Sequence, residues 1–137
     1  QRQCRFGKDA VVVAGAGNRG SEFPEFPAAE AKEVKGVISV AATNQYDQLA
    51  PFSNFGGWVW VAAPGEGITS SVPPNQYATW RGTSMSAPIV AGQVALVKSR
   101  FRGFNAADIV NHITSTGDSI NGPVPKRINI AYSLGLK

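Results

Sequence analysis

Hydrophobic residues along the chain gather into short runs that glycine and proline separate. Residues 10–14, 37–42 and 58–62 are apolar at nearly every position instead of alternating with polar residues. Such runs are typical of strands that are buried on both faces, as in a parallel sheet. Glycine-rich or proline-containing turns close the first and the third run, at residues 15–20 and 64–65. The pattern therefore predicts three strands of one sheet.

A long helical pattern follows these runs, over residues 84–100. It is apolar on nearly every side, with Gln93 as the lone interior exception, so this helix should cross the middle of the protein. A second helix is expected over residues 106–114, with Asn105 as its N-cap. Strands that alternate with helices indicate an α/β architecture with a mainly parallel sheet.

Shorter elements fill the rest of the chain. One or two helical turns are expected at residues 28–34, a short strand at 77–80 and a terminal helix at 128–134. Loops and turns are expected at residues 44–54, 68–74 and 117–125, where turn-forming residues are frequent.

Composition excludes several classes of function. The 137 residues are 43% apolar and 16% charged, as in one soluble globular domain or part of one. The net charge of +4 is modest, and its basic clusters at residues 2–8 and 98–102 are not interleaved with aromatic residues, so no nucleic-acid partner is expected. No stretch is long enough to span a membrane. Cys4 is the only cysteine, which excludes an intrachain disulfide and a zinc site built from thiolates.

The most distinctive chemistry lies where the longest helix begins, in the segment Gly82-Thr83-Ser84-Met85-Ser86-Ala87-Pro88. A serine between small residues at this point can present its hydroxyl to an acyl carbon, and the glycine lets a substrate backbone approach. Amides at the helix N-terminus supply positive potential where an oxyanion would form. The residues alone leave an alternative open, in which Thr83 or Ser84 is only an N-cap.

A glycine-rich turn with the spacing Gly15-x-Gly17-x-x-Gly20 follows the first strand. This spacing matches the dinucleotide-binding fingerprint, which also requires a helix that starts at the turn and an acidic residue after the next strand. Pro24 and Pro27 interrupt any such helix, and Thr43 and Asn44 stand where the acid is required. The sequence therefore argues against a nucleotide site.

Asn18, in the same turn, has two interpretations. Its side-chain amide is a neutral donor beyond the carboxyl end of a strand, where it could stabilise a tetrahedral oxyanion. Alternatively, asparagine is present only because it tolerates a left-handed backbone conformation in a turn.

No residue is a convincing base for the serine. His112 is the only histidine, and it lies within the second helix, four residues after Asp108. An ion pair between these two side chains on a solvated helix face explains them better than catalysis does. Asp9, Asp47 and Asp118 lie in loops or near the start of the chain, without the pattern of an orienting carboxylate.

Together these motifs resemble those of the subtilisin-like serine proteases, the subtilases. Residues 82–88 are similar to the family's nucleophile motif, and Ala14-Gly15-Ala16-Gly17-Asn18-x-Gly20 is similar to its oxyanion-asparagine motif. Similar segments in the same order are Phe26-Pro27-Ala28, residues 37–42, residues 52–56, Ala63-Pro64-Gly65 and Arg127-Ile128-Asn129. The resemblance covers essentially the whole chain. It implies a three-layer α/β fold with helices on both faces of a mainly parallel sheet, present here incompletely.

The resemblance also implies roles for individual residues. Ser84 would be the nucleophile, Asn18 an oxyanion donor beside the Ser84 backbone amide, and Thr83 a secondary support. One wall of the pocket for the residue before the scissile bond would be formed by Gly15, Ala16 and Gly17. The implied function is that of a secreted serine endopeptidase, which hydrolyses peptide or protein substrates through an acyl-enzyme and uses no cofactor.

The chain also departs from the family pattern. The family's aspartate and histidine motifs precede the asparagine motif, and this sequence contains neither. Residues 1–137 are therefore expected to be the C-terminal part of a catalytic domain, with the N-terminal part as its required partner. The chain alone is expected to be inactive, because an unassisted serine hydroxyl is a poor nucleophile at neutral pH. The alternative is a non-catalytic subtilase-like subunit or remnant, used for assembly or peptide binding.

Two further expectations concern metal and specificity. Aromatic residues stand at positions 56–60, where the family's weaker cation site would need carboxylates, so no metal is expected on this part of the chain. The short loop over residues 18–27 returns Glu25 towards the pocket wall. There it would favour a basic side chain in the substrate, while an orientation towards solvent stays an open alternative.

Overall fold

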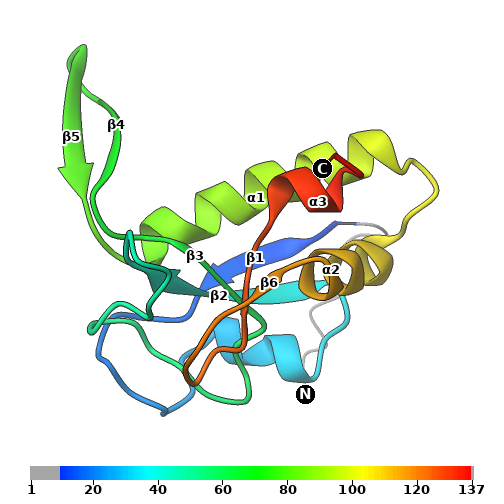
Figure 1. Ribbon diagram of the computed structural model, residues 1–137, viewed down its shortest axis with the longest axis horizontal. Coiled ribbons are helices and arrows are strands. Elements are labelled where there is room, and N and C mark those ends of the chain that lie inside the picture. Colours follow the sequence, from blue (N-terminus) through cyan, green and yellow to red (C-terminus); the bar gives the residue numbers. More distant parts are fainter. Residues whose placement is uncertain (1–9, 137) are drawn as a thin grey trace.

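The computed structural model describes residues 10–136, and its centre is a five-stranded sheet (Figure 1). The strand order is β1-β2-β3-β7-β6, and only the β6–β7 pair is antiparallel. The mainly parallel sheet is therefore confirmed. The strands are β1 (Val12–Gly15), β2 (Val37–Thr43), β3 (Val61–Pro64), β6 (Asp118–Ser119) and β7 (Lys126–Arg127).

Helical elements cover both faces of this sheet, which gives the expected three layers (Figure 1). On one face, α1 (Thr83–Arg100) and α2 (Ala106–Ser115) pack on β-branched side chains such as Ile38 and Val61. On the other face, the 3₁₀ helix η1 (Ala28–Lys32) packs on small residues such as Ala41. A last short helix, α3 (Ile130–Ser133), follows the sheet. The central strand β2 is buried at every position, as its sequence predicts.

The first predicted strand is real but less buried than expected. Val12 and Val13 are only half-buried, because β1 lies at the edge of the sheet and no strand among residues 10–136 pairs with its other side. Cys4, Asp9 and the first basic cluster lie outside the described residues.

The third predicted strand begins later than its apolar run suggests. Regular pairing starts at Val61, and residues 58–60 are not in a strand. The hydroxyl of Ser39 donates to the Trp58 carbonyl at 2.7 Å and accepts from the Trp60 amide at 3.0 Å. The Trp60 amide also donates to the Ser39 backbone carbonyl at 3.2 Å, so side-chain and backbone bonds together satisfy this segment before regular pairing begins.

The expectation of a turn-rich segment over residues 68–74 is wrong. Strand β4 (Ile68–Val72) pairs with β5 (Gln76–Trp80) in an antiparallel hairpin that projects from the body of the protein (Figure 1). Both strands are mostly exposed, so they lack the alternation of apolar and polar residues that marks a half-buried strand. Pro73 and Pro74 belong to the connection between these strands and not to a longer loop.

Helix α1 forms as predicted, but the described residues bury only one of its sides. Its fully buried residues lie on one stripe that includes Val90, Gln93 and Val97. The opposite side is exposed, and Leu96 retains 48% of its accessible surface. The helix is apolar all round, while the described elements cover only the face that packs on β1, β2, β3 and α2. Among residues 10–136, no helix is long and apolar enough to span a membrane.

The second helix confirms its predicted cap. Asn105 accepts a hydrogen bond from the Asp108 amide, and the Asp108 carboxylate accepts one from the Asn105 amide, each at 2.9 Å. The expected pair between Asp108 and His112 is therefore wrong, because the carboxylate serves the capping box. His112 is half-buried and its Nε2 lies 2.8 Å from the Ser133 carbonyl oxygen.

Candidate active site

The N-terminus of α1 lies at the carboxyl edge of the parallel strands. The Gly82 amide donates to the Gly65 carbonyl, just beyond β3, at 2.8 Å. Ser86, one turn into the helix, donates its hydroxyl to the Ala63 carbonyl at 3.0 Å. A Cβ on Gly65 would lie only 2.6 Å from the Ala42 side chain, so glycine permits this close approach. Ligand sites of open α/β sheets form at this edge.

The turn that carries Asn18 lies against the same helix end. The Thr83 amide donates to Asn18 Oδ1 at 2.8 Å, and the Thr83 hydroxyl accepts from the Gly17 amide at 3.1 Å. A Cβ on Gly15 would lie 2.9 Å from the Thr83 hydroxyl. These contacts hold the end of β1, the turn and the start of α1 together.

Asn18 and Ser84 border one opening. Because Oδ1 of Asn18 accepts from Thr83, its Nδ2 remains as the donor group of this side chain. A Cβ on Gly82 would lie 3.7 Å from Asn18 Nδ2 and 3.8 Å from the Ser84 backbone nitrogen. Glycine at position 82 thus leaves a space with two N–H donors on its border. Ser84 itself is exposed, whereas Thr83 is buried.

The alternatives in which Thr83 or Ser84 is only an N-cap, or Asn18 only a left-handed turn residue, are wrong. The N-cap of α1 is Gly82, at φ 146°, and no side chain caps the helix, so neither Thr83 nor Ser84 is present as a cap. The left-handed positions of the turn are Gly17 and Gly20, and Asn18 is not among the residues with positive φ. Neither serine nor asparagine is therefore explained by local backbone requirements.

A nucleotide site at this turn has no structural basis in the described residues. The turn runs into a loop, and the next helical element, η1, begins only at Ala28. No helix N-terminus therefore follows the glycines, where a pyrophosphate would need one.

His112 lies far from the candidate nucleophile. It packs edge-on against Phe101 and Phe104, which directly follow the C-terminus of α1. Ser84 stands at the opposite end of this 18-residue helix, which is about 27 Å long. Asp47 and Asp118 each lie 2.8 Å from the Arg127 guanidinium, so both carboxylates are used in structural ion pairs.

The predicted pocket wall brings Glu25 against the glycine turn. A Cβ on Gly17 would lie 2.6 Å from Glu25 Oε2, so the carboxylate faces the wall instead of extending into solvent. The Glu25 side chain retains 35% of its accessible surface. Its other oxygen lies 3.3 Å from the guanidinium of Arg19, an ion pair that local sequence patterns do not predict. Ala16, the middle residue of the predicted wall, is fully buried.

Two tryptophans bind the segment that follows Asn18, one in the loop before η1 and one in η1 itself. The indole of Trp58 donates to the Glu22 carbonyl at 2.9 Å, and the indole of Trp60 donates to the Ala31 carbonyl at 3.0 Å. Both tryptophans belong to the segment at residues 56–60, where the sequence predicts no metal. Within residues 10–136, no three His, Cys, Asp or Glu side chains gather as metal ligands.

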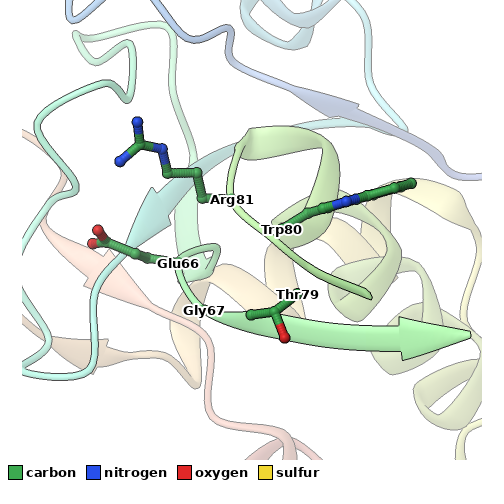
Figure 2. Close-up of a pocket in the computed structure, with 5 residues that line it drawn as sticks. All are labelled: Glu66, Gly67, Thr79, Trp80 and Arg81. Carbon is green, nitrogen blue, oxygen red and sulfur yellow. The ribbon is translucent and has the colours of Figure 1, made fainter. Parts of the chain in front are cut away.

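A hollow beside the hairpin is a feature that the sequence did not indicate. It has a volume of about 440 Å³ and lies between the start of β4 and the end of β5, close to Gly82 in the chain. Figure 2 shows Glu66 and Arg81 on one side of it, with Trp80 pointing away from them. Its lining residues are Glu66, Gly67, Thr79, Trp80 and Arg81.

Comparison with known proteins gives the chain several relatives. A model of the subtilase family matches residues 2–129. The chain is 47% identical to the thermophilic serine proteinase of Bacillus sp. (strain AK1) over 117 residues, which cover 85% of this chain and 28% of that protein. It is 43% identical to thermitase of Thermoactinomyces vulgaris over 117 residues, which cover 85% of this chain and 40% of the relative.

A solved structure extends the likeness to the fold. A protease from Pseudoalteromonas arctica superimposes with a TM-score of 0.82 and 27% identity, over 91% of this chain and 42% of its own. The chain thus spans less than half the length of each of these three proteins.

Proposed function

The chain belongs to the subtilase family, and we propose that it supplies the nucleophile and the oxyanion donors of a serine endopeptidase. One observation carries the proposal: the Asn18 amide and the Ser84 backbone amide border the same opening, next to an exposed serine. Two preorganised N–H donors aimed at one point are what the oxygen of a tetrahedral intermediate requires.

In this mechanism, the Ser84 hydroxyl oxygen bonds to the carbonyl carbon of the scissile peptide. The carbonyl oxygen takes the negative charge and accepts hydrogen bonds from Asn18 Nδ2 and the Ser84 amide. The serine proton passes to a histidine and from there to the leaving amine, after which water hydrolyses the acyl-enzyme. The histidine and its aspartate belong to the N-terminal part of the catalytic domain, which we propose as the partner of residues 1–137.

Two surfaces suit that partner. Among residues 10–136, no strand pairs with the outer edge of β1, which could accept another parallel strand. The side of α1 that these residues leave uncovered is an apolar face that includes Leu96. An extracellular location belongs to the same proposal, because the family resemblance implies secretion.

Labelling with a fluorophosphonate tests the proposed function. Applied to the complete protease that contains this chain, the probe is expected to modify one serine, and peptide mapping by mass spectrometry is expected to place it at Ser84. Probe attachment at another residue contradicts the assignment. A complete protein that hydrolyses no peptide and takes up no probe is instead the non-catalytic subunit of the alternative.

We further propose that Glu25 favours lysine or arginine before the scissile bond. Its carboxylate lies against the Gly17 wall, and Arg19 already holds one of its oxygens. A partly exposed carboxylate that is shared with Arg19 contributes up to about 1 kcal/mol to binding a cation. Glu25→Gln is therefore expected to lower kcat/KM for lysine peptides about fivefold and to leave leucine peptides within about twofold.

The matched control is Glu22→Gln, which removes an exposed carboxylate from the same loop. It is expected to leave both substrates unchanged, because Glu22 contributes its backbone carbonyl to Trp58 and not its side chain. Arg19→Ala is expected to strengthen the preference for lysine, since it frees the Glu25 carboxylate. Equal or faster turnover of leucine and phenylalanine peptides by the unmodified protease contradicts this specificity.

A further inference from the structure

We infer that Asn54 is a positioning residue for the reaction, because it holds the oxyanion turn, residues 16–21, in the conformation that presents Asn18. The inference rests on the proposed function and concerns a residue to which neither the motifs nor the mechanism gives a role. Asn54 lies in the loop after β2, more than thirty residues from the turn, and is completely buried.

Asn54 binds both arms of the turn. Before Asn18, its Nδ2 donates to the Ala16 carbonyl at 3.0 Å and its backbone amide donates to the Gly17 carbonyl at 2.9 Å. After Asn18, its Oδ1 accepts from the Arg19 amide at 3.0 Å and from the Ser21 amide at 3.1 Å. One residue therefore satisfies four backbone groups around the oxyanion donor.

The chemistry requires a carboxamide at this position. An asparagine side chain combines an oxygen with two lone pairs and a nitrogen donor, and here the oxygen uses both lone pairs. Aspartate lacks the donor, and serine has only one polar atom with a shorter reach. The fit is close, because a Cβ on Gly17, at φ 106°, would collide with Asn54 Nδ2.

Asn54 is itself fixed to the sheet. The neighbouring Ser53 hydroxyl donates to the Asn54 carbonyl at 3.0 Å and accepts from the Ala42 amide of β2 at 2.9 Å. Hydrogen bonds of residues 53 and 54 thus connect the central strand β2 to the turn. Asn54 touches the turn on either side of Asn18 and acts on the reaction only through it.

Removal of the carboxamide is expected to affect turnover more than substrate binding. In the complete protease, Asn54→Ala is expected to lower kcat about 10- to 100-fold with KM within about threefold, because a donor displaced by about 1 Å loses most of its effect. The affinity of a peptide aldehyde, whose adduct carries the oxyanion, is expected to fall by the same factor. The affinity of the corresponding peptide alcohol is expected to stay unchanged.

A double-mutant cycle separates positioning from general damage. In an Asn18→Ala background, Asn54→Ala is expected to change kcat less than about threefold, because the group that it positions is gone. If Asn54→Ala does not fold, Asn54→Ser takes its place in the same cycle. An unchanged kcat in the wild-type background, or an equal loss in both backgrounds, overturns the inference.

Gln93→Met is the matched control, since it removes an equally buried carboxamide that binds Ser133 and has no hydrogen bond to the turn. It is expected to lower the melting temperature and to leave kcat within about threefold.

Hydrogen exchange distinguishes this inference from the proposed function. The Arg19 and Ser21 amides, which Asn54 binds, are expected to exchange at least tenfold faster in Asn54→Ser, while the Val40 amide of β2 stays protected. A wild-type protein without activity would refute the proposed function. The exchange rates at residues 19 and 21 would still test whether Asn54 holds the turn. Unchanged exchange at residues 19 and 21 overturns the inference even in an active protease.

Discussion

Ser84→Ala is expected to lower kcat for peptide hydrolysis about 10⁶-fold in the complete protease. This size is carried over from subtilisin, the relative for which it is established. No neighbouring hydroxyl can replace the lost nucleophile. Thr83 is buried with its oxygen accepting from the Gly17 amide, and Ser86 donates its hydroxyl to the Ala63 carbonyl behind the helix.

Steady-state kinetics with a chromogenic peptide measures this loss. Ser86→Ala is the matched control, because it removes a hydroxyl two residues away that is buried and points at β3. It is expected to retain kcat within about threefold and to lose about 1 kcal/mol of stability with its hydrogen bond. A Ser84→Ala protein that hydrolyses peptides within a hundredfold of wild type would show that the nucleophile is elsewhere.

Gly82→Ala is expected to lower kcat/KM about 10³-fold while the protein remains folded. The new methyl group would lie 3.5–3.8 Å from Asn18 Oδ1, Asn18 Nδ2 and the Ser84 amide, which is ordinary contact and not a clash. It would, however, occupy the space in which a substrate oxygen must approach each donor to about 2.7–3.1 Å. The backbone at φ 146° adds about 1–3 kcal/mol of strain for alanine.

Kinetics and thermal unfolding together check this prediction. Gly92→Ala is the control within the same helix, since a Cβ there meets nothing within 4 Å. It is expected to raise stability by about 0.5–1 kcal/mol and to leave activity unchanged. Activity of Gly82→Ala within tenfold of wild type would mean that the substrate oxygen binds elsewhere.

Local sequence patterns predicted the elements that have a continuous apolar run or a recognisable helix cap. The run at residues 37–42 became β2, and the Asn105 cap formed with its reciprocal partner Asp108. Patterns failed where a side chain or an exposed position decides the structure. The Ser39 hydroxyl binds backbone groups of Trp58 and Trp60 before regular pairing begins, and the hairpin of β4 and β5 has little apolar alternation to reveal it.

The residues of the candidate site also fall into those that local patterns reveal and those that they do not. Ser84 and Asn18 lie in motifs of a few residues, so the sequence alone could single them out. Asn54 and the Arg19 partner of Glu25 act through contacts that only the folded chain creates. The missing information is long-range, because no period or cap relates position 54 to the turn at residues 16–21.

The parallel pairing of Ala62 with Arg127 constrains the order in which this protein can fold. Both α1 and α2 lie between these partners in the chain, so synthesis must pass Ser84 and most of the sheet before β7 can join β3. Closing so long a loop has a high entropic cost, and topologies of this kind fold slowly. Ser84 and the start of α1 are therefore synthesised well before β7 can pair with β3 and complete the sheet.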